Sequence, residues 1–477
     1  MYLEALTVTL LCGISLVNGL FHFRHKDFLF KHEQSFNKSN LRSDPTHWIE
    51  QLVDHLNYTD HRTWRQKYYK VIDFWKPEGP ILLSLGGEGG ITWDEVEAEF
   101  HLGGNDHEST SLIRQIAVET NAAFFMLEHR YYGDSQPFHE PTTENMAFLH
   151  SRQALADAAH LLKTIKKSRS FQKSKVIVVG GSYSGNLAAW MKLMYPELVD
   201  AVLASSAPVL AKKDFYEYLE TVTDTFRTYG SQECVDKITE RFNTFRELFQ
   251  SPEGITKVKV ENFVCEDVDM AVFEHQVSFY KDMIEIYSYE AQYGTPTSIS
   301  SMCRDHNLFT SYRTSESNVY WNGENNCSHY GTLPNGDWRS WSYQTCTEFG
   351  YFQSTSSCKQ MFGNAVPVEY FYKECRDFFG KEFDEQRVDQ GVINTNRMYG
   401  GLAPNVTNVV FVNGDMDPWH RLSIVQDLTA DAPAIFIKGS SHCHDQDPDI
   451  NDPSDTDNIR EARKQIKNLL KKWIGQA

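Results

Sequence analysis

Runs of apolar residues alternate with stretches of helical periodicity from about residue 68 onward. Several of the apolar runs are continuous, and continuous runs are typical of parallel strands that are covered on both faces. The sequence predicts strands at Val71–Trp75, Ile81–Leu85, Ala122–Glu128, Lys175–Gly180, Ala201–Ser205, Val409–Asn413 and Ala434–Lys438. It predicts helices at Thr110–Thr120, Glu144–Lys167, Asn186–Tyr195 and Ile459–Ile474. This alternation predicts an α/β fold with a doubly wound, mostly parallel sheet.

The alternation stops near residue 211. Helical periodicity dominates from there to about residue 345, and no further strand is predicted before Val409. The clearest helical segments are Phe215–Tyr229, Cys234–Phe249 and Val268–Tyr289. We therefore expect a core whose first part is 45–211, an inserted and mainly helical cap at 212–345, and a second core part at 346–477.

The N-terminal apolar run Ala5–Val17 has 13 residues. A membrane-spanning helix needs about 20, whereas this length is typical of the core of a signal peptide. Residues 1–19 are therefore predicted to be a signal peptide, although no Lys or Arg precedes the run. No later run is long enough to span a bilayer, so we expect no membrane partner once the signal is removed.

The cysteines and the glycosylation sequons both indicate a protein of the secretory pathway. Eight cysteines follow the signal peptide, and this even number predicts four disulfides formed in an oxidising compartment. They are Cys234, Cys265, Cys303, Cys327, Cys346, Cys358, Cys375 and Cys443. Four glycosylation sequons begin at Asn37, Asn57, Asn326 and Asn405. The sequence thus predicts a secreted or lysosomal glycoprotein.

The chain is acidic, with 46 Lys and Arg against 64 Asp and Glu and a net charge of −18. Such a charge repels nucleic acid, so no nucleic-acid partner is expected. Six Asp lie between residues 445 and 457, but the run lacks the Gly and the Glu of a calcium loop, and we expect a solvated loop. No metal or cofactor is predicted.

The segment Lys175–Ser184 predicts a strand that turns sharply into a helix. A Ser on such a turn is held in a strained conformation with its hydroxyl exposed above the sheet, as in the nucleophile elbow Gly-x-Ser-x-Gly. The segment 180–184 reads Gly-Gly-Ser-Tyr-Ser, so Ser replaces the last Gly, and Gly185 follows one position later. Ser182 is the predicted nucleophile, because centring the motif on Ser184 fits worse.

A Ser nucleophile needs a base, and the base needs a carboxylate that orients it. In this architecture the order along the chain is Ser, Asp, His. Asp415 and Asp417 both follow the strand Val409–Asn413, and His442 and His444 both follow the strand Ala434–Lys438. The residues alone leave both pairs of alternatives open.

Backbone N–H groups should form the oxyanion hole. One would be that of Tyr183, directly after the nucleophile. The other would come from the Gly-rich loop 86–90, with Gly87 and Glu88 as the candidate donors. Loss of one such donor typically costs about 3 kcal/mol of transition-state stabilisation.

Several spaced blocks resemble the serine peptidases that include lysosomal Pro-X carboxypeptidase and dipeptidyl peptidase II, most closely the thymus-specific serine protease branch. The resemblance extends from about residue 45 to the C-terminus. The blocks are EHRYYGDSQP (128–137), GGSYSGNLAAW (180–190), SSAP (205–208), QTCTEFG (344–350), FVNGDMDPWH (411–420) and GSSHCHD (439–445). The resemblance implies an α/β-hydrolase fold with a helical cap inserted after the SSAP strand.

The resemblance also implies roles for single residues. It assigns the triad carboxylate to Asp417 and the base to His442, and it places Trp419 at the substrate pocket, with Asn186 as a further candidate there. Two departures argue against strict proline specificity: Ser184, Gly185 and Asn186 replace Gly-Gly and an apolar residue, and Cys443 replaces a second His. Neither departure removes a member of the triad.

We therefore expect a serine exopeptidase that acts on peptides through an acyl-enzyme, with proline-related specificity as one candidate. The cap would close over the site and restrict it to peptide termini. A serine esterase or lipase with the same triad is the first alternative, and a catalytically silent binding homologue is the second. Peptide substrates are the expected partners, and a second copy of the chain, as in a homodimer, is a further candidate.

Overall fold

The computed structural model describes residues 45–100, 111–304, 335–447 and 455–476. Its main sheet has eight strands in the order β1-β2-β4-β3-β5-β6-β9-β10. The strands are β1 (His47–Leu52), β2 (Thr63–Val71), β3 (Ile81–Leu85), β4 (Ala123–Leu127), β5 (Val176–Gly181), β6 (Ala201–Ser205), β9 (Val409–Gly414) and β10 (Ala434–Ile437). The predicted signal peptide and the sequons at Asn37 and Asn326 lie outside the described residues. Asn57 and Asn405 are exposed, and their glycosylation stays a prediction.

The strand directions follow the α/β-hydrolase pattern. β2 runs antiparallel to β1 and β4, and each later neighbour in the sheet is parallel, with Leu83 opposite both Phe125 and Val178. The predicted fold class is therefore confirmed. The predicted strand Val71–Trp75 is wrong, because the chain leaves the sheet after Val71 and turns. The real strand, β2, alternates buried and exposed residues over much of its length, so it does not form a continuous apolar run.

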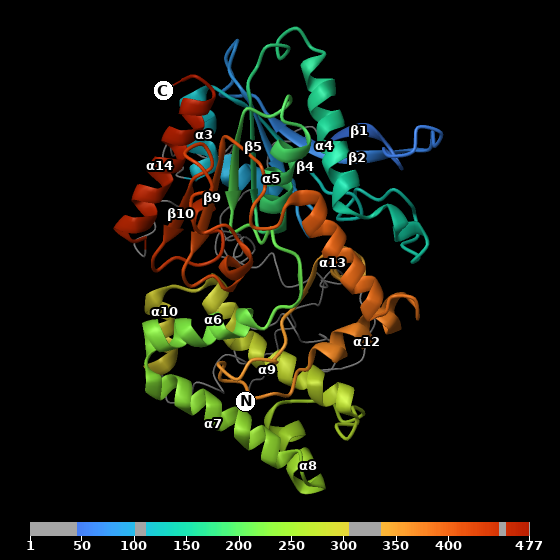
Figure 1. Ribbon diagram of the computed structural model, residues 1–477, viewed down its shortest axis with the longest axis vertical. Helices are drawn as coiled ribbons and strands as arrows, with labels where there is room; N and C mark the ends of the chain where they lie inside the picture. The colour runs from blue at the N-terminus through green and yellow to red at the C-terminus, as the bar shows by residue number, and fades with distance from the viewer. Residues whose placement is uncertain (1–44, 101–110, 305–334, 448–454, 477) are drawn as a thin grey trace, which may run out of the picture.

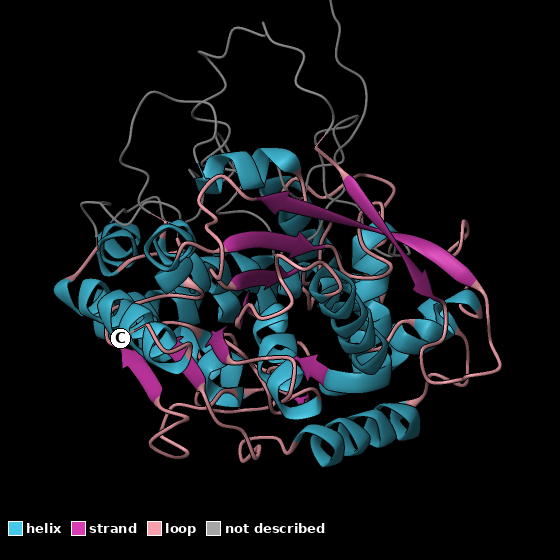
Figure 2. Ribbon diagram, turned by 90° about the horizontal axis from the view of Figure 1, so that it is seen from above, coloured by secondary structure: helices cyan, strands magenta, loops and turns pink. Residues whose placement is uncertain are grey.

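Both faces of the sheet are covered, as the continuous apolar runs predicted. In β3, Leu83 packs on one side with residues of α4 (Ser151–Lys166) and α5 (Tyr183–Met194). Leu82 packs on the other side, where the covering helices are α2 (Trp93–Phe100), α3 (Leu112–Thr120) and α14 (Asp457–Trp473). Figures 1 and 2 show helices on both sides of the sheet. The sheet therefore supplies a rigid platform for the loops at its edge.

A large, mostly helical segment separates β6 from β9. Two short strands, β7 (Lys212–Asp214) and β8 (Gly350–Phe352), pair in parallel outside the main sheet. The helices are α6 (Glu217–Thr225), α7 (Gln232–Leu248), α8 (Pro252–Glu261), α9 (Phe273–Tyr293), α10 (Pro296–Arg304), α11 (Gly336–Gln344), α12 (Val368–Phe379) and α13 (Glu385–Tyr399). In Figure 1, α6 to α10 gather below the sheet. No helix among the described residues is both long and apolar enough to span a membrane.

The cysteines do not pair completely. Cys358 and Cys443 are free thiols, so the predicted four disulfides are wrong and the eight cysteines can form three at most. The described bridges join Cys234 to Cys303 and Cys346 to Cys375, and Cys265 is also disulfide-bonded. An even count therefore did not mean full pairing: Cys358 is exposed, and Cys443 lies close to Gly181 at the end of β5.

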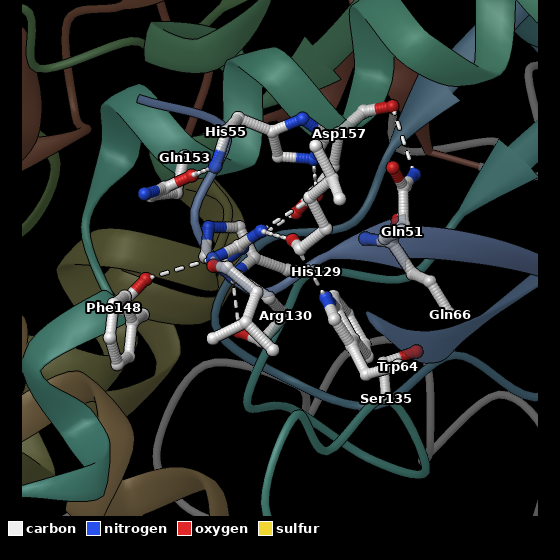
Figure 3. Close-up of polar contacts among 12 residues, drawn as sticks. Gln51, His55, Trp64, Gln66, His129, Arg130, Ser135, Phe148, Gln153 and Asp157 are labelled. Atoms are coloured by element: carbon white, nitrogen blue, oxygen red, sulfur yellow. Dashed lines mark hydrogen bonds and ion pairs between the residues drawn. The ribbon is translucent and has the colours of Figure 1, made fainter. Parts of the chain in front are cut away.

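An ion pair between Arg130 and Asp157, two fully buried residues, ties the first strands to α4 (Figure 3). Arg130 donates from Nε and Nη2 to the two carboxylate oxygens at 2.6 and 2.7 Å. Further Arg130 N–H groups reach the carbonyls of Val53 and Phe148, and His55 Nε2 lies 2.8 Å from Asp157 Oδ1. Because both charges are paired and hydrogen-bonded, the network fixes the segment 128–133 beside the sheet.

We expect the protein to unfold at a lower temperature at pH 8 than at pH 6.5. Burial raises the pKa of Glu348 to about 7 and that of Glu285 to about 8. Each folded carboxyl keeps a proton that the unfolded chain loses above about pH 4.5. Stability therefore falls as pH rises from about 4.5 to these values, by up to about 1.4 kcal/mol per pH unit for each group.

Buried histidines set the acidic limit of that stability range. Burial lowers the pKa of His129 and of His150 to about 4, so stability is lost as pH falls from about 6.5 toward 4. Thermal unfolding between pH 5 and 8 should therefore show a maximum near pH 6. Glu348→Gln should flatten the decline above pH 6.5, and a melting temperature that climbs steadily to pH 8 would contradict the assignment.

Candidate active site

Ser182 stands at the sharp turn between β5 and α5, as the sequence predicted. Its backbone has φ 58° and ψ −132°, a conformation that costs a non-Gly residue roughly 1–3 kcal/mol. Two hydrogen bonds hold the turn: the N–H of Ser182 donates to Ser205 O at 3.0 Å, and the N–H of Gly185 donates to Ser182 O at 2.9 Å. The strain is therefore supported by the neighbouring strand β6 and by the first turn of α5.

Two glycines allow the close approach of strand and helix at this turn. A Cβ on Gly180 would lie 2.1 Å from Ser184 O, and one on Gly185 would lie 2.7 Å from Ser205 O. Ser184, which replaces the usual Gly, fits because its hydroxyl donates to Gly181 O at 2.7 Å and accepts from Gly181 N–H at 3.0 Å. The departure from the motif therefore leaves the turn intact.

Asp417 and His442 meet beyond the ends of β9 and β10. Both are buried, and Asp417 Oδ2 lies 2.9 Å from His442 Nδ1. The second carboxylate oxygen of Asp417 accepts from the N–H of Trp419 at 2.9 Å. His442 Nε2 has no hydrogen-bond partner among the described residues. The free nitrogen is the one that a catalytic base would use, since the carboxylate fixes the other.

The two alternatives that the sequence left open lie elsewhere. Asp415 accepts from the N–H of Gly439 and from the hydroxyl of Tyr229, both at 2.7 Å. His444 Nε2 lies 3.0 Å from Asp455 Oδ1. Asp455 and Asp445 are buried, so the expectation of a solvated loop is wrong at both of these positions.

The Glu88 carboxyl lies beside Ser182 and the two predicted backbone donors. Ser182 Oγ donates to Glu88 Oε1 at 3.1 Å, and the backbone N–H groups of Glu88 and Tyr183 lower the pKa of the Glu88 carboxyl against the larger effect of burial. A Cβ on Gly87 would touch Ser184 at 3.6 Å, so Gly87 also lies against the elbow. The N–H groups of Tyr183 and Glu88 therefore lie near the Ser182 hydroxyl, and their role as an oxyanion hole stays a prediction.

A cavity of about 270 Å³ opens beside Ser182 and His442. Glu88, Tyr293 and Cys443 also line it. Neither Trp419 nor Asn186, the residues expected at the pocket, is among the described residues that line this cavity. Trp419 donates from Nε1 to Gln292 at 3.0 Å, and Asn186 donates to Pro208 O at 3.1 Å from a fully buried position.

The sequence profile of the family described as serine carboxypeptidase S28 matches residues 51–466. The chain belongs to the S28 family. A putative serine protease of Caenorhabditis elegans is 33% identical over 89% of this chain and 87% of its own. Human thymus-specific serine protease is 32% identical over 90% of this chain and 86% of its own. Human lysosomal Pro-X carboxypeptidase is 29% identical over 90% and 88%.

Solved structures include a proline iminopeptidase of Mycobacterium smegmatis with a TM-score of 0.39 and 12% identity, covering 86% of this chain and 95% of that one. The S28 family match and the relatives at 33% and 32% identity confirm the family resemblance in the sequence. The structure shows where the blocks that carry this resemblance lie. EHRYYGDSQP and QTCTEFG meet at Tyr183, whose hydroxyl lies 3.1 Å from His129 Nε2 and 2.8 Å from Gln344 Nε2. These blocks therefore fix the residue next to Ser182.

Sequence reasoning missed the part of the S28 site that comes from α9. Gln292 O accepts the backbone N–H of His442 at 2.7 Å, and the Tyr293 ring stands edge-on to the His442 ring at 5.9 Å. The Gln292 side chain also accepts from the hydroxyl of Tyr218 at 2.6 Å. Helical periodicity predicted this helix, but it carries no information about a contact with a loop about 150 residues later.

Asp417 stabilises the positively charged imidazolium that His442 becomes when it accepts a proton. Burial opposes the imidazolium, but the charge and hydrogen bond of Asp417 outweigh burial and raise the pKa of His442 well above its usual value. Burial raises the pKa of the Glu88 carboxyl, against its hydrogen bonds from backbone N–H groups and Ser182 and the charge of His442. The site is therefore built to stabilise an imidazolium, the species that a Ser-His-Asp mechanism forms.

Proposed function

We propose that this S28 member is a serine peptidase that hydrolyses peptides through Ser182, His442 and Asp417. The observation that carries the proposal is the 2.9 Å contact between Asp417 and His442 Nδ1, with Nε2 left free at the cavity that Ser182 also lines. His442 takes the proton of Ser182 as the hydroxyl attacks the peptide carbonyl, and then gives it to the leaving amine. Water then attacks the acyl-enzyme: His442 takes a proton from the water molecule and returns a proton to the Ser182 oxygen as the acyl group leaves.

Glu88 has to move for this reaction to occur. The substrate oxygen needs the N–H groups of Tyr183 and Glu88, and both act on the Glu88 carboxyl in the free protein. The Ser182 hydroxyl must also leave Glu88 and turn to His442 Nε2. Substrate binding therefore replaces the Glu88 carboxyl by the developing charge of the substrate oxygen, at donors that are already in place.

The cap supports a preference for peptide termini. The end of α9 lies over the site, since Gln292 bonds to the backbone of His442 and Tyr293 lines the cavity. Phe215, Tyr218 and Trp419 pack behind them in a buried aromatic cluster. A long polypeptide would have to pass through this packing in both directions, whereas a chain end enters from one side.

Blocking the peptide terminus that the enzyme recognises should strongly reduce cleavage. We expect mass-spectrometric profiling of a peptide library to show short pieces released from one end only. For a matched set of one peptide with free, acetylated and amidated ends, blocking that end should lower kcat/KM at least a hundredfold. Equal cleavage inside a doubly blocked peptide would reject the exopeptidase assignment, and turnover of short acyl esters alone would favour an esterase.

The proposed compartment is the secretory pathway, with the lysosome or the extracellular space as the destination. The disulfides Cys234–Cys303 and Cys346–Cys375 support it, because such bridges form in oxidising compartments. Two curated relatives are named lysosomal Pro-X carboxypeptidase in human and cattle. We carry proline-related specificity over from these names as part of the proposal.

A further inference from the structure

The cavity beside Ser182 contains a thiol that the proposed reaction does not use. Cys443 is free and partly exposed, and it lines the same cavity as Ser182 and His442. A Cβ on Gly181 would lie 2.8 Å from its sulfur, so the thiol stands directly against the nucleophile elbow. Any group attached to this sulfur would therefore extend into the space where the substrate must bind.

The backbone fixes the position of the sulfur. Cys443 has φ 55°, in the left-handed region that is uncommon for a residue with a side chain. Its N–H donates to Ser206 Oγ at 2.9 Å, and its carbonyl accepts from the N–H of Gln446 at 2.9 Å. The thiol is thus held at the edge of the cavity by bonds on both sides of its α-carbon.

A proton acceptor stands next to this thiol. His442 is 4% exposed, lines the cavity and has an Nε2 atom with no hydrogen-bond partner among the described residues. The Cys443 side chain also interacts with the His442 imidazole and contributes to the raised pKa of His442. A thiol that can pass its proton to a neighbouring imidazole as it attacks is more reactive toward electrophiles than an isolated one.

We propose that Cys443 is a modification site for low-molecular-weight disulfides, and that the mixed disulfide reversibly closes the active site. The Cys443 sulfur attacks one sulfur of the disulfide while its proton goes to His442 Nε2. The disulfide bond breaks, a new bond joins Cys443 to one half, and the other half leaves as a thiolate that recovers the proton. Attack by a free thiol on the adduct reverses the step.

The loss of activity rests on the proposed function, but adduct formation does not. The described residues that line the cavity include Glu88, Glu95, Glu99 and Asp447 and no Lys or Arg, so a cationic disulfide suits the test. The full-length protein is incubated with cystamine, and the adducts are mapped by mass spectrometry of unreduced peptides. Cys358, the exposed free thiol, is the internal control in the same molecule.

We expect peptidase activity to fall at least tenfold in proportion to the adduct on Cys443, and mild thiol treatment to restore it. Cys443→Ser should keep its own untreated rate in cystamine, whereas Cys358→Ser should be inactivated like the unmodified sequence. The proposal is overturned if Cys443 remains unmodified while Cys358 reacts, or if full modification of Cys443 leaves the rate unchanged. A chain that forms the adduct but has no peptidase activity before treatment refutes the proposed function instead.

Discussion

Replacing Ser182 with alanine is expected to lower kcat on a peptide substrate by about 10⁵ to 10⁶-fold, the loss typical of a Ser nucleophile that acts with its His as a unit. The change removes only the hydroxyl, which in the free protein donates to Glu88. The loss should appear in kcat, because the cavity and the two backbone donors remain. Steady-state kinetics together with labelling by a fluorophosphonate measure it, and the variant should take up no label.

Ser184→Ala is the matched control for this prediction. Ser184 belongs to the same motif and also lines the cavity, but its hydroxyl bonds only to the backbone of Gly181. We expect the Ser184→Ala variant to lose about 1 kcal/mol of stability. Its kcat should fall less than tenfold, and a fluorophosphonate should label it as fully as the unmodified sequence. Peptide cleavage that survives in Ser182→Ala at the original rate would assign the activity to a contaminant, and loss confined to Ser184→Ala would move the nucleophile.

The sequence predicted the sheet well where strands are buried on both faces. Ile81–Leu85 and Ala201–Ser205 match their strands to the residue, because the central strands read as plain apolar runs between turns. β1 and β2 are different: β1 is an edge strand, β2 lies next to it, and the two pair antiparallel and alternate in burial. Such alternating segments are less conspicuous than continuous apolar runs when strands are predicted from hydrophobicity alone, and β1 was not predicted.

The candidate site was also predicted only in part from the sequence. Local chemistry predicted Ser182, since a strand, a turn of small residues and a helix follow one another directly. Asp417 and Asp415 are indistinguishable locally, and only the family resemblance preferred the one that the structure places against His442. The side chain of Glu88 was not predicted at all, because its position depends on the contact with Ser182, almost a hundred residues away in the sequence. Contacts of this kind are set by the fold, not by spacing.

Replacing Asp417 with asparagine is expected to lower kcat by about 10⁴-fold. The amide keeps the size of the carboxylate but has no charge, so it stabilises the imidazolium of His442 far less. Its NH₂ group can also face Nδ1 and force the ring into the wrong tautomer, with the proton on Nε2. Nε2 would then be a donor and could not accept the proton of Ser182. Single-turnover kinetics across pH measure the effect, and KM should change little because Asp417 is fully buried.

Asp415→Asn separates this charge effect from a general disturbance of the loop. Asp415 lies two residues away in the same turn, but it accepts from Gly439 and Tyr229 and does not contact His442. We expect its kcat to stay within about threefold of the original value, with a lower melting temperature from the weakened contacts to residues 229 and 439. If both variants lost activity equally, the turn as a whole would be required, and the specific role of the Asp417 charge would be rejected. A loss in Asp417→Asn alone, with an unchanged melting temperature, ties the rate to the contact between Asp417 Oδ2 and His442 Nδ1.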